Sequence, residues 1–364
     1  MKHILHCHST FMLGGKEARA VQLMNAFGDA ASHTILTAVP GALAARDAID
    51  PGVKVAFPDD APSLEGKPSL ERYRMLSRYM QQFDLVLTYN WGSMDAVGAR
   101  RLFPKGCPPL IHHEDGFNAD EAQKLNWKRN LFRQLTFDAA RHVVVPSRRL
   151  EAIATRHWRR PDVIRIPNGI DVAAYAAPPK PDAIPGVVQR DGEVIIGTLA
   201  GLRGVKNLPC LVRAVAPIAN ARLVIVGEGP ERETILAEAR RCNMAARIEM
   251  PGFLPHPARY IGLFDIFALS SDSEQFPISL VEAMAAGLPA VSTDVGDVAT
   301  MVSAENQKFV LPVNDEAGLS QAIRTLAGDP TLRAKIGAAN RALALADYDQ
   351  TAMIARYADL YCLT

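Results

Sequence analysis

Short apolar runs rich in Val, Ile and Leu alternate with helix-length amphipathic segments along most of the 364-residue chain. Strands buried on both faces form continuous apolar runs, and parallel neighbours need a crossover helix between them, so this alternation is typical of parallel sheets. Ten strands are predicted, at 3–7, 33–39, 84–89, 109–113, 142–147, 194–200, 222–227, 247–252, 265–270 and 289–294. The expected fold class is therefore α/β, with two Rossmann-like, doubly wound domains.

The chain is longer than a single hydrophobic core usually supports, so two domains are the default expectation. Clustered prolines and a lack of periodicity between residues 171 and 193 predict a linker. The expected domains are 1–170 and 191–346, joined by a linker at 171–190. Two open parallel sheets joined in this way are expected to face each other across a cleft. Ligands of such sheets bind at the carboxyl ends of the strands, where helix N-termini favour a phosphate.

Composition narrows the function classes. Residues 1–170 carry 23 Lys/Arg against 17 Asp/Glu, and the remainder carries 17 against 22, so the first half suits an anionic partner unless its charge is simply solvated. Five cysteines without metal-type spacing argue against a metal site and a complete disulfide framework, and favour a reducing cytosol. We see no signal peptide, membrane span or nucleic-acid motif, so a cytoplasmic location is expected.

The stretch "SSDSEQFPISLVEAMAAG" (270–287) follows an apolar run, crosses a polar turn and enters a segment with helical spacing. Ser279 precedes Glu282 by three residues, which is typical of a capping box, and Gly287 is expected to end the helix. Glu274 lies outside the helix and gains nothing from the cap. A carboxylate beside an anion site is useful if it holds a sugar hydroxyl or a developing cation, and Glu282 could reach a ribose diol.

The longer stretch 270–298 resembles the carboxyl-terminal signature of glycosyltransferase family 4, a group of retaining, metal-independent transferases with the GT-B fold, including its pair of glutamates eight positions apart. Three further segments match in register, and the resemblance spans nearly the whole chain. They are "LGGKEARAVQLMNAF" (13–27), "VIRIPNGIDV" (163–172) and "LVIVGEGPERE" (223–233). The ordered combination is much more specific than any one motif.

The resemblance implies roles for individual residues. Glu274 would contact the transferred sugar near its reacting carbon, Glu282 would hold the ribose, and Lys206 would bind the donor phosphates. The remaining donor contacts fall on two short segments. The backbone of Phe276, Pro277, Ile278 and Ser279 would hold the diphosphate, and Gly252, Phe253 and Leu254 would flank the base.

Two positions depart from the family pattern. Gly201 stands where the family usually has an arginine that shares the diphosphate charge. Arg203, two positions on, could supply this contact from a different backbone point, or it could point to solvent. Loss of one such contact weakens donor binding by about 1.5–3 kcal/mol. Gln275 stands where glycine is common and could narrow the diphosphate turn.

In the first domain, "LIHHEDGF" (110–117) places two histidines at a strand end. Consecutive strand residues point opposite ways, so only one is expected to face the site. The resemblance favours His112 as the donor-sugar contact, with His113 as the alternate. Gly15, next to Gly14, would let the backbone approach the donor phosphate or the acceptor, although a plain tight turn explains both glycines equally well.

The expected function is transfer of a hexose, with retention, from a nucleotide diphosphate donor to a hydroxyl acceptor in cell-envelope polysaccharide or glycolipid synthesis. No metal and no cofactor is expected. The acceptor class stays open between a polysaccharide, an oligosaccharide and a lipid-linked molecule, with contacts from first-domain loops such as 57–74. A non-hydrolysing nucleotide-sugar epimerase and a non-catalytic nucleotide-sugar-binding family member are the rival functions.

Two further expectations concern surfaces. The basic helical segments 124–135 and 148–160 mix Lys and Arg with Leu, Phe and Trp. They favour peripheral contact of the first domain with the cytoplasmic face of the inner membrane, or else ordinary packing against the sheet. The last segment, 347–364, resembles the family's final helix and is expected to pack back on the first domain.

Overall fold

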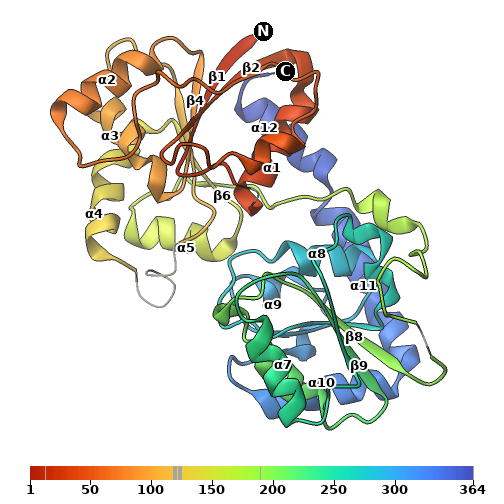
Figure 1. Cartoon of the computed structure of the whole chain (residues 1–364). Coiled ribbons are helices and arrows are strands. Elements are labelled where there is room, and N and C mark those ends of the chain that lie inside the picture. Colours follow the sequence, from red (N-terminus) through yellow and green to blue (C-terminus); the bar gives the residue numbers. More distant parts are fainter. Residues whose placement is uncertain (13, 118–120, 122–124, 189, 364) are drawn as a thin grey trace. The chain divides into compact units, whose positions relative to one another are not determined.

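The structure, a computed structural model, describes residues 1–12, 14–117, 121, 125–188 and 190–363. The chain divides into two compact units, and each is described by itself. The first contains residues 1–168 and 352–364, and the second contains residues 169–351. Figure 1 shows the chain coloured along its sequence.

The first unit contains a seven-stranded, all-parallel sheet in the order β3-β2-β1-β4-β5-β6-β7. Its order reverses direction at β1, as in a doubly wound sheet. Its strands are β1 (Lys2–His8), β2 (Ala31–Thr37), β3 (Val55–Ala56), β4 (Leu85–Tyr89), β5 (Leu110–His113), β6 (His142–Val145) and β7 (Ile164–Arg165).

Helices pack on both faces of this sheet (Figure 1). Buried residues of α2, α3 and α5 form the core on one face, and those of α1 and α12 form the core on the other. The described helices of this unit are α1 (Gly15–Phe27), α2 (Leu70–Met80), α3 (Met94–Leu102), α4 (Trp127–Thr136), α5 (Arg148–His157) and α12 (Gln350–Leu360), of which α12 begins at the end of the second unit.

The second unit contains a six-stranded, all-parallel sheet in the order β10-β9-β8-β11-β12-β13. Its strands are β8 (Val194–Leu199), β9 (Ala221–Val226), β10 (Ile248–Gly252), β11 (Ile266–Leu269), β12 (Ala290–Thr293) and β13 (Val310–Leu311). Its described helices are α6 (Leu208–Val215), α7 (Arg232–Arg241), α8 (Ile278–Ala285), α9 (Val298–Met301), α10 (Glu316–Gly328) and α11 (Pro330–Asp347).

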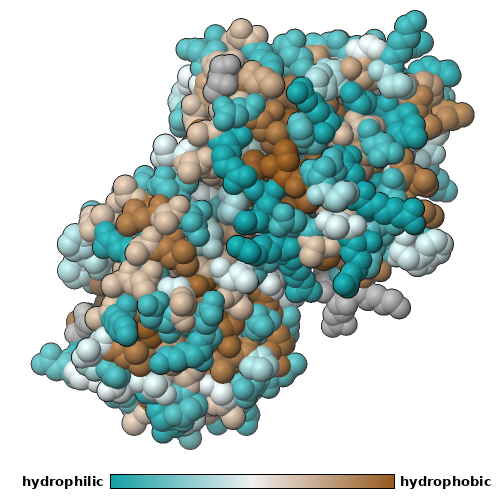
Figure 2. All heavy atoms as spheres, turned by 180° about the vertical axis from the view of Figure 1, so that it is seen from behind, coloured by the Kyte–Doolittle hydropathy of each residue, from teal (hydrophilic) through white to brown (hydrophobic). Residues whose placement is uncertain are grey.

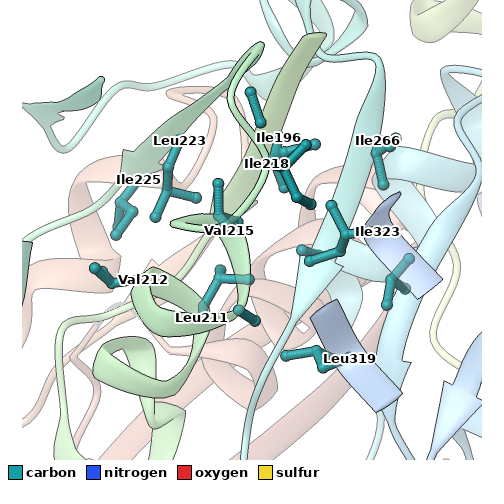
Figure 3. Packing of buried hydrophobic residues seen from close by; sticks show 14 of the residues in the cluster. Ile196, Leu211, Val212, Val215, Ile218, Leu223, Ile225, Ile266, Leu319 and Ile323 are labelled. Carbon is teal, nitrogen blue, oxygen red and sulfur yellow. The ribbon is translucent and has the colours of Figure 1, made fainter. Parts of the chain in front are cut away.

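The core of the second unit lies on both faces of the sheet. On one face, apolar side chains of β8 and β9 interdigitate with those of α6 and α10, as Figure 3 shows for Ile196, Leu223, Leu211 and Ile323. On the other face, α8 is buried almost completely, because its apolar residues surround most of the helix. This packing fixes the N-terminus of α8 next to the ends of the strands.

All ten predicted strands are present, which confirms the α/β class and the two doubly wound sheets. The sequence pattern missed the edge strands β3, β7 and β13, each of which has two residues. Two residues are too few to show a period, so such strands leave no pattern in the sequence.

The segment predicted as a linker, 171–190, belongs to the second unit in this structure. Val172, Ile184 and Val187 are buried in the same core cluster as α8, and the amide of Lys180 donates to the carbonyl of Arg259. The proline-rich composition predicted the irregular backbone correctly. The few apolar residues between the prolines still anchor it, so it is not a free linker.

At the surface, hydrophilic residues cover most of the face shown in Figure 2, with apolar residues in small groups between them. All five cysteines are free thiols in this structure. Among the described residues, no helix combines the length and the hydropathy that crossing a bilayer would require.

Candidate functional site

A small pocket in the second unit lies where β8 and β11, which are neighbours in the sheet, end. Both strands are parallel, so the loops that follow them meet at the same edge. The lining residues come from these two strand ends, the loop that follows each, and the first turns of α6 and α8. They are Thr198, Leu199, Ala200, Lys206, Leu208, Leu269, Ser270, Ser271, Glu274 and Ser279.

Lys206 and Glu274 form an ion pair inside this pocket. The hydroxyl of Ser271 also donates a hydrogen bond to Glu274 Oε1, at 2.8 Å. The two charged side chains are only 16% and 13% exposed. Sequence reasoning predicted both residues as site residues, and the structure brings them into direct contact although they are 68 positions apart.

The loop that carries Lys206 is tied to the loop that carries Glu274. Ser270 Oγ donates to the carbonyl of Lys206 at 2.9 Å, and the amide of Asp272 donates to the carbonyl of Val205 at 2.8 Å. A third bond runs from Asn207 Nδ2 to Asp272 Oδ1, at 2.9 Å. These bonds hold the cation and the carboxylate at a fixed spacing, which is the kind of support that a binding site needs.

The N-terminus of α8 provides a second positive element. The helix begins at Ile278 after Pro277, and no described side chain caps its first turn. The predicted capping box of Ser279 and Glu282 is therefore wrong, because Ser279 lies within the first turn and lines the pocket instead. Free backbone N–H groups beside Lys206 make a site that suits an anion. Gly287, with φ of +76°, follows the helix as expected.

Glu282 has a different environment from the one predicted. Burial raises its pKa to about 7, although a hydrogen bond from Tyr175 favours the charged form. Tyr175 comes from the segment 171–190, which the sequence predicts as a linker. Near neutral pH, Glu282 therefore holds its proton much more readily than an exposed glutamate does.

The predicted base-flanking residues lie at the end of β10, two strands away from β8. Neighbouring strands are about 4.8 Å apart, so the end of β10 lies about 10 Å from the end of β8 along this edge of the sheet. Gly252 has φ of +90°, and a Cβ there would lie 2.6 Å from Glu228 Oε1. Phe253 is exposed, whereas Leu254 is partly buried and accepts a hydrogen bond from the Tyr260 hydroxyl. The aromatic ring of Phe253 is therefore exposed to solvent just after the end of β10.

The structure also shows the surroundings of the two positions that depart from the family pattern, Gly201 and Gln275. Arg203 is exposed, and its Nε lies 3.7 Å from the position that a Cβ on Gly201 would occupy. The guanidinium therefore starts close to the point from which a side chain at 201 would extend. Gln275 does not line the pocket, and its amide oxygen is buried without a hydrogen-bond partner among the described residues. Phe276 packs against Tyr348 with ring centroids 5.7 Å apart.

The two candidate histidines of the first unit are both buried at the end of β5. His112 lies 2.9 Å from the Thr88 hydroxyl through Nδ1 and 3.5 Å from Glu114 through Nε2. His113 Nε2 lies 2.8 Å from the Tyr361 hydroxyl, and burial lowers the pKa of this histidine well below its usual value. The two rings point into different clusters, but neither side chain is accessible in this structure. The predicted contact of His112 with a donor sugar stays a prediction.

Gly14 and Gly15 begin α1, and neither has a positive φ. A tight turn is therefore not what requires glycine at these positions. A Cβ on Gly15 would meet nothing within 4 Å, whereas one on Gly14 would lie 3.0 Å from Glu17 Oε2. Gly15 is exposed, so its backbone is open to a ligand.

Sequence reasoning missed two ion pairs next to these histidines, one of them completely buried and the other largely so. Arg19, on α1, is paired with Asp115, which follows β5. Arg19 also donates a hydrogen bond to Asn168 Oδ1 at 2.9 Å, and Asn168 is the last residue of the first chain segment of this unit. Arg133 Nε donates to Glu114 Oε2 at 3.0 Å, and both side chains are inaccessible. Asp115, Glu114 and Asn168 lie inside motifs that the sequence pattern singles out. The sequence signal that could have indicated these ion pairs is the presence of polar residues directly after predicted strands.

Comparison with known proteins agrees with this geometry. The sequence model described as "Glycosyl transferases group 1" matches residues 180–343, and the one described as "Glycosyltransferase Family 4" matches residues 13–174. The chain belongs to glycosyltransferase family 4, as its sequence indicated.

Curated relatives match over part of their length. N-acetyl-alpha-D-glucosaminyl L-malate synthase of Bacillus anthracis is 27% identical over 174 residues, which is 47% of this chain and 46% of that protein. A lipopolysaccharide core biosynthesis glycosyltransferase of Rhizobium meliloti is 26% identical over 43% of this chain and 46% of its own length. The matched stretch thus spans about half the length of these relatives.

Solved structures match over the whole chain. The Anabaena protein HepE in complex with UDP superimposes with a TM-score of 0.81 at 19% identity, covering 100% of both chains. Sucrose-phosphate synthase from Thermosynechococcus elongatus gives 0.76 at 20% identity, covering 99% of this chain and 98% of that one. These similarities confirm the GT-B fold.

Proposed function

We propose that this protein transfers a sugar from a nucleotide diphosphate donor to a hydroxyl acceptor, with retention at the anomeric carbon. The observation that carries the proposal is the convergence of Lys206, Glu274 and the uncapped N-terminus of α8 in one pocket. The cation and the helix N–H groups suit a diphosphate, and the carboxylate suits a sugar hydroxyl. Because HepE was solved in complex with UDP, a uridine nucleotide is the first donor to test.

The pocket residues have separate tasks in this mechanism. The donor diphosphate replaces Glu274 as the partner of Lys206, and charge that develops on the leaving group is stabilised by Lys206 and the α8 amides. Glu274, released from the lysine, turns to the sugar. Arg203 is proposed as an additional phosphate ligand, Phe253 as the base-stacking residue, and His112 as a sugar contact. We propose that no metal or cofactor takes part.

The wider context is also part of the proposal. The relatives include a glycosyltransferase of lipopolysaccharide core synthesis, and another acts on a diphospho-undecaprenol acceptor. We propose a cytoplasmic enzyme of cell-envelope polysaccharide or glycolipid synthesis, with the first unit on the acceptor side. Peripheral membrane contact of the first unit is supported by the nine Lys/Arg against two Asp/Glu in residues 125–160.

A panel of radiolabelled nucleotide sugars tests the function. The purified chain is incubated with each donor, alone and with a membrane extract that supplies acceptors, and labelled products are separated. We expect label to move to an acceptor from one donor, with the nucleoside diphosphate released in equal amount. Interconversion of nucleotide sugars without an acceptor would indicate an epimerase. Binding of a donor without any turnover would indicate a non-catalytic member of the family.

Gly296 offers a sharp test of the Glu274 turn. It has φ of +60°, and a Cβ there would lie 2.6 Å from the carbonyl oxygen of Glu274 and 2.7 Å from that of Gln275. These oxygens belong to the backbone, so a Gly296→Ala substitution must move the turn. Because a displacement of about 1 Å can cost about a hundredfold, we expect kcat/KM for transfer to fall by about that factor.

Gly287→Ala is the matched control. Gly287 also has a positive φ, of +76°, so alanine suffers similar backbone strain there. Its Cβ would meet nothing closer than 3.9 Å. Thermal unfolding measured on both variants separates the shared loss of stability from the loss of transfer. Equal transfer rates in the two variants would show that the contact with the Glu274 turn has no importance.

A further inference from the structure

The first unit contains a cavity of about 470 Å³. This volume lies in the range of small-molecule sites. Its walls come from the segment before α2, from the residues that follow β4, and from the first half of α4. They include Trp91, Asp95, Asn126, Lys128, Arg129 and Phe132.

The cavity lining combines aromatic and apolar side chains with one carboxylate, that of Asp95, and with Asn126, Lys128 and Arg129, whose guanidinium lies 5.2 Å from the centre of the Trp91 ring. Trp91 and Phe132 lie edge to face with ring centroids 5.7 Å apart. Asp95 is held in place by Arg72, at 2.6 Å, and by the Tyr73 hydroxyl, at 3.1 Å. A carboxylate has more acceptor positions than these two donors use, so Asp95 can also accept from ligand hydroxyls. An aromatic wall with a fixed acceptor suits a sugar ring, which has an apolar face and a polar edge.

The outer face of α4 is unusual for a helix that faces solvent. Trp127, Leu131 and Leu135 are spaced by four residues and are 68%, 44% and 61% exposed. Side chains at this spacing lie above one another on one face, so they form a continuous apolar stripe. The polar and charged residues Asn130 and Arg133 of the same helix are buried instead.

Lys128 lies between the cavity and the stripe. It lines the cavity, it is exposed, and its Nζ lies 5.7 Å from the centre of the Trp127 ring. At about 100° per residue, Lys128 stands on the helix between Leu131 on one side and Phe132 on the other. The order across the surface is therefore a polar and aromatic cavity, a cation, and an apolar stripe.

We propose that this surface binds the acceptor, and that the acceptor is a saccharide joined through a phosphate to a hydrocarbon chain. The sugar occupies the cavity against Trp91 and Asp95, the phosphate pairs with Lys128, and the hydrocarbon lies along Trp127, Leu131 and Leu135. The excess of nine basic over two acidic residues in 125–160 favours such an anionic ligand. This inference rests on the proposed function, of which it names the acceptor class.

Four probes separate the three parts. Decyl glucosyl phosphate contains all of them, whereas decyl phosphate, decyl glucoside and glucose 1-phosphate each lack one. Binding to the full chain is measured by calorimetry below the micelle concentration of each probe. We expect decyl glucosyl phosphate to bind at least about tenfold more tightly than any of the other three, because each of them lacks either a charge-assisted hydrogen bond, a buried apolar segment or the sugar contacts.

Variants assign each part to its residue. Leu131→Gln with Leu135→Gln should weaken the three decyl probes by about tenfold and leave glucose 1-phosphate unchanged. Lys128→Gln should weaken the three phosphate probes only. Asp95→Asn and Trp91→Leu should weaken the three sugar probes only, and near-ultraviolet circular dichroism checks that each variant is folded. The matched control is Leu102→Gln, at an apolar side chain that is 53% exposed on another helix of the unit.

The proposal fails if the Leu102 control weakens the decyl probes as much as the stripe variant does, or if the Lys128, Asp95 and Trp91 variants bind decyl glucosyl phosphate normally. It also fails if the stripe variant changes only self-association in sedimentation, because the stripe would then be an interface between copies. UDP binding is measured on every variant. If nucleotide sugars bind and decyl glucosyl phosphate does not, this inference alone is rejected. If no nucleotide sugar binds, the proposed function is rejected.

Discussion

Replacing Glu274 with glutamine is expected to slow sugar transfer strongly and, at the same time, to tighten the binding of a nucleoside diphosphate. In the described state Glu274 is paired with Lys206 inside a small pocket. The carboxylate therefore competes with the diphosphate for the lysine and repels its charge. A glutamine has nearly the same shape and can still accept from Ser271, so the pocket is expected to keep its form.

The size of both effects follows from the geometry. Two unit charges about 6 Å apart interact by about 3 kcal/mol at an effective dielectric constant near 20, so removing the repulsion should tighten UDP binding about ten- to a hundredfold. Loss of a group that acts on the reacting sugar should lower kcat by about a hundred- to a thousandfold. Calorimetry with UDP and a steady-state transfer assay measure the two quantities.

Asp272→Asn is the matched control, because it removes one negative charge from the same loop. Asp272 is exposed and is bonded to Asn207 instead of Lys206. Solvent screens an exposed charge, so UDP affinity should change by less than about threefold. If UDP binding tightened equally in both variants, the cause would be the loss of any negative charge from this loop, and the specific competition of Glu274 for Lys206 would be rejected. Unchanged transfer in Glu274→Gln would reject the role of this residue in the reaction.

Lowering the pH from about 7 to about 5 is expected to unfold the first unit before the second. His6, His8 and His113 are buried near one another around Tyr89, and burial is the main cause that lowers the pKa of each well below 6.5. Lys16 and Arg19 lower the pKa of His8 further. The same cause lowers the pKa of His33, which is bonded to His6, to about 4.

The direction of the effect is set by which state takes up the proton. An unfolded histidine, with a pKa of about 6.5, binds a proton below that pH, whereas these folded histidines do not. Their contribution is therefore fully present above about pH 6.5 and is lost as the pH falls, by about 1.4 kcal/mol per pH unit for each group. Three or four such groups exhaust a typical domain stability within about two pH units.

The second unit should respond in the opposite direction. It contains one of the nine histidines, His256, and its Glu282 has a pKa raised to about 7. A carboxyl with a raised pKa contributes most below its unfolded pKa and loses that contribution as the pH rises through about 7. All three tryptophans lie in the first unit, so tryptophan fluorescence follows its unfolding by urea at each pH.

His8→Phe tests the cause of the acid sensitivity. Neither ring nitrogen of His8 has a hydrogen-bond partner among the described residues, and the ring stacks on Tyr89 at 4.1 Å. Phenylalanine can keep the stacking without titrating. The number of protons taken up on unfolding, which sets the slope of the unfolding free energy against pH, should therefore fall by about one. His157→Phe, at a partly exposed site on α5, should leave it unchanged. An unaltered pH dependence in His8→Phe would show that this histidine is not one of the groups responsible.

The sequence predicted the sheets because their central strands are buried on both faces and so form long apolar runs. It predicted Lys206 and Glu274 because these residues lie in motifs whose order along the chain is specific. The ion pair between them could not be predicted, since it depends on which strands are neighbours in the sheet. The edge strands were too short to leave a pattern.

Two local errors have a common physical origin. The Ser279 capping box was a correct match to a pattern, but the helix begins directly after Pro277 and leaves the hydroxyl to the pocket. The segment 171–190 has the composition of a linker, but Ile184 and Val187 are enough to bury it. In both cases the surrounding tertiary structure overrode a local preference that a sequence pattern can report only in isolation.

The polypeptide crosses between the two units twice, after Asn168 and again after Thr351. The two crossings are joined, because the amide of Ile170 donates to the carbonyl of Tyr348 and the amide of Gln350 donates to the carbonyl of Ile170, each at 2.9 Å. Gly169 fits only without a side chain, since a Cβ there would lie 2.9 Å from the carbonyl oxygen of Asp349. A single protease cut in either crossing would therefore leave both halves tethered, and releasing one of them would take two.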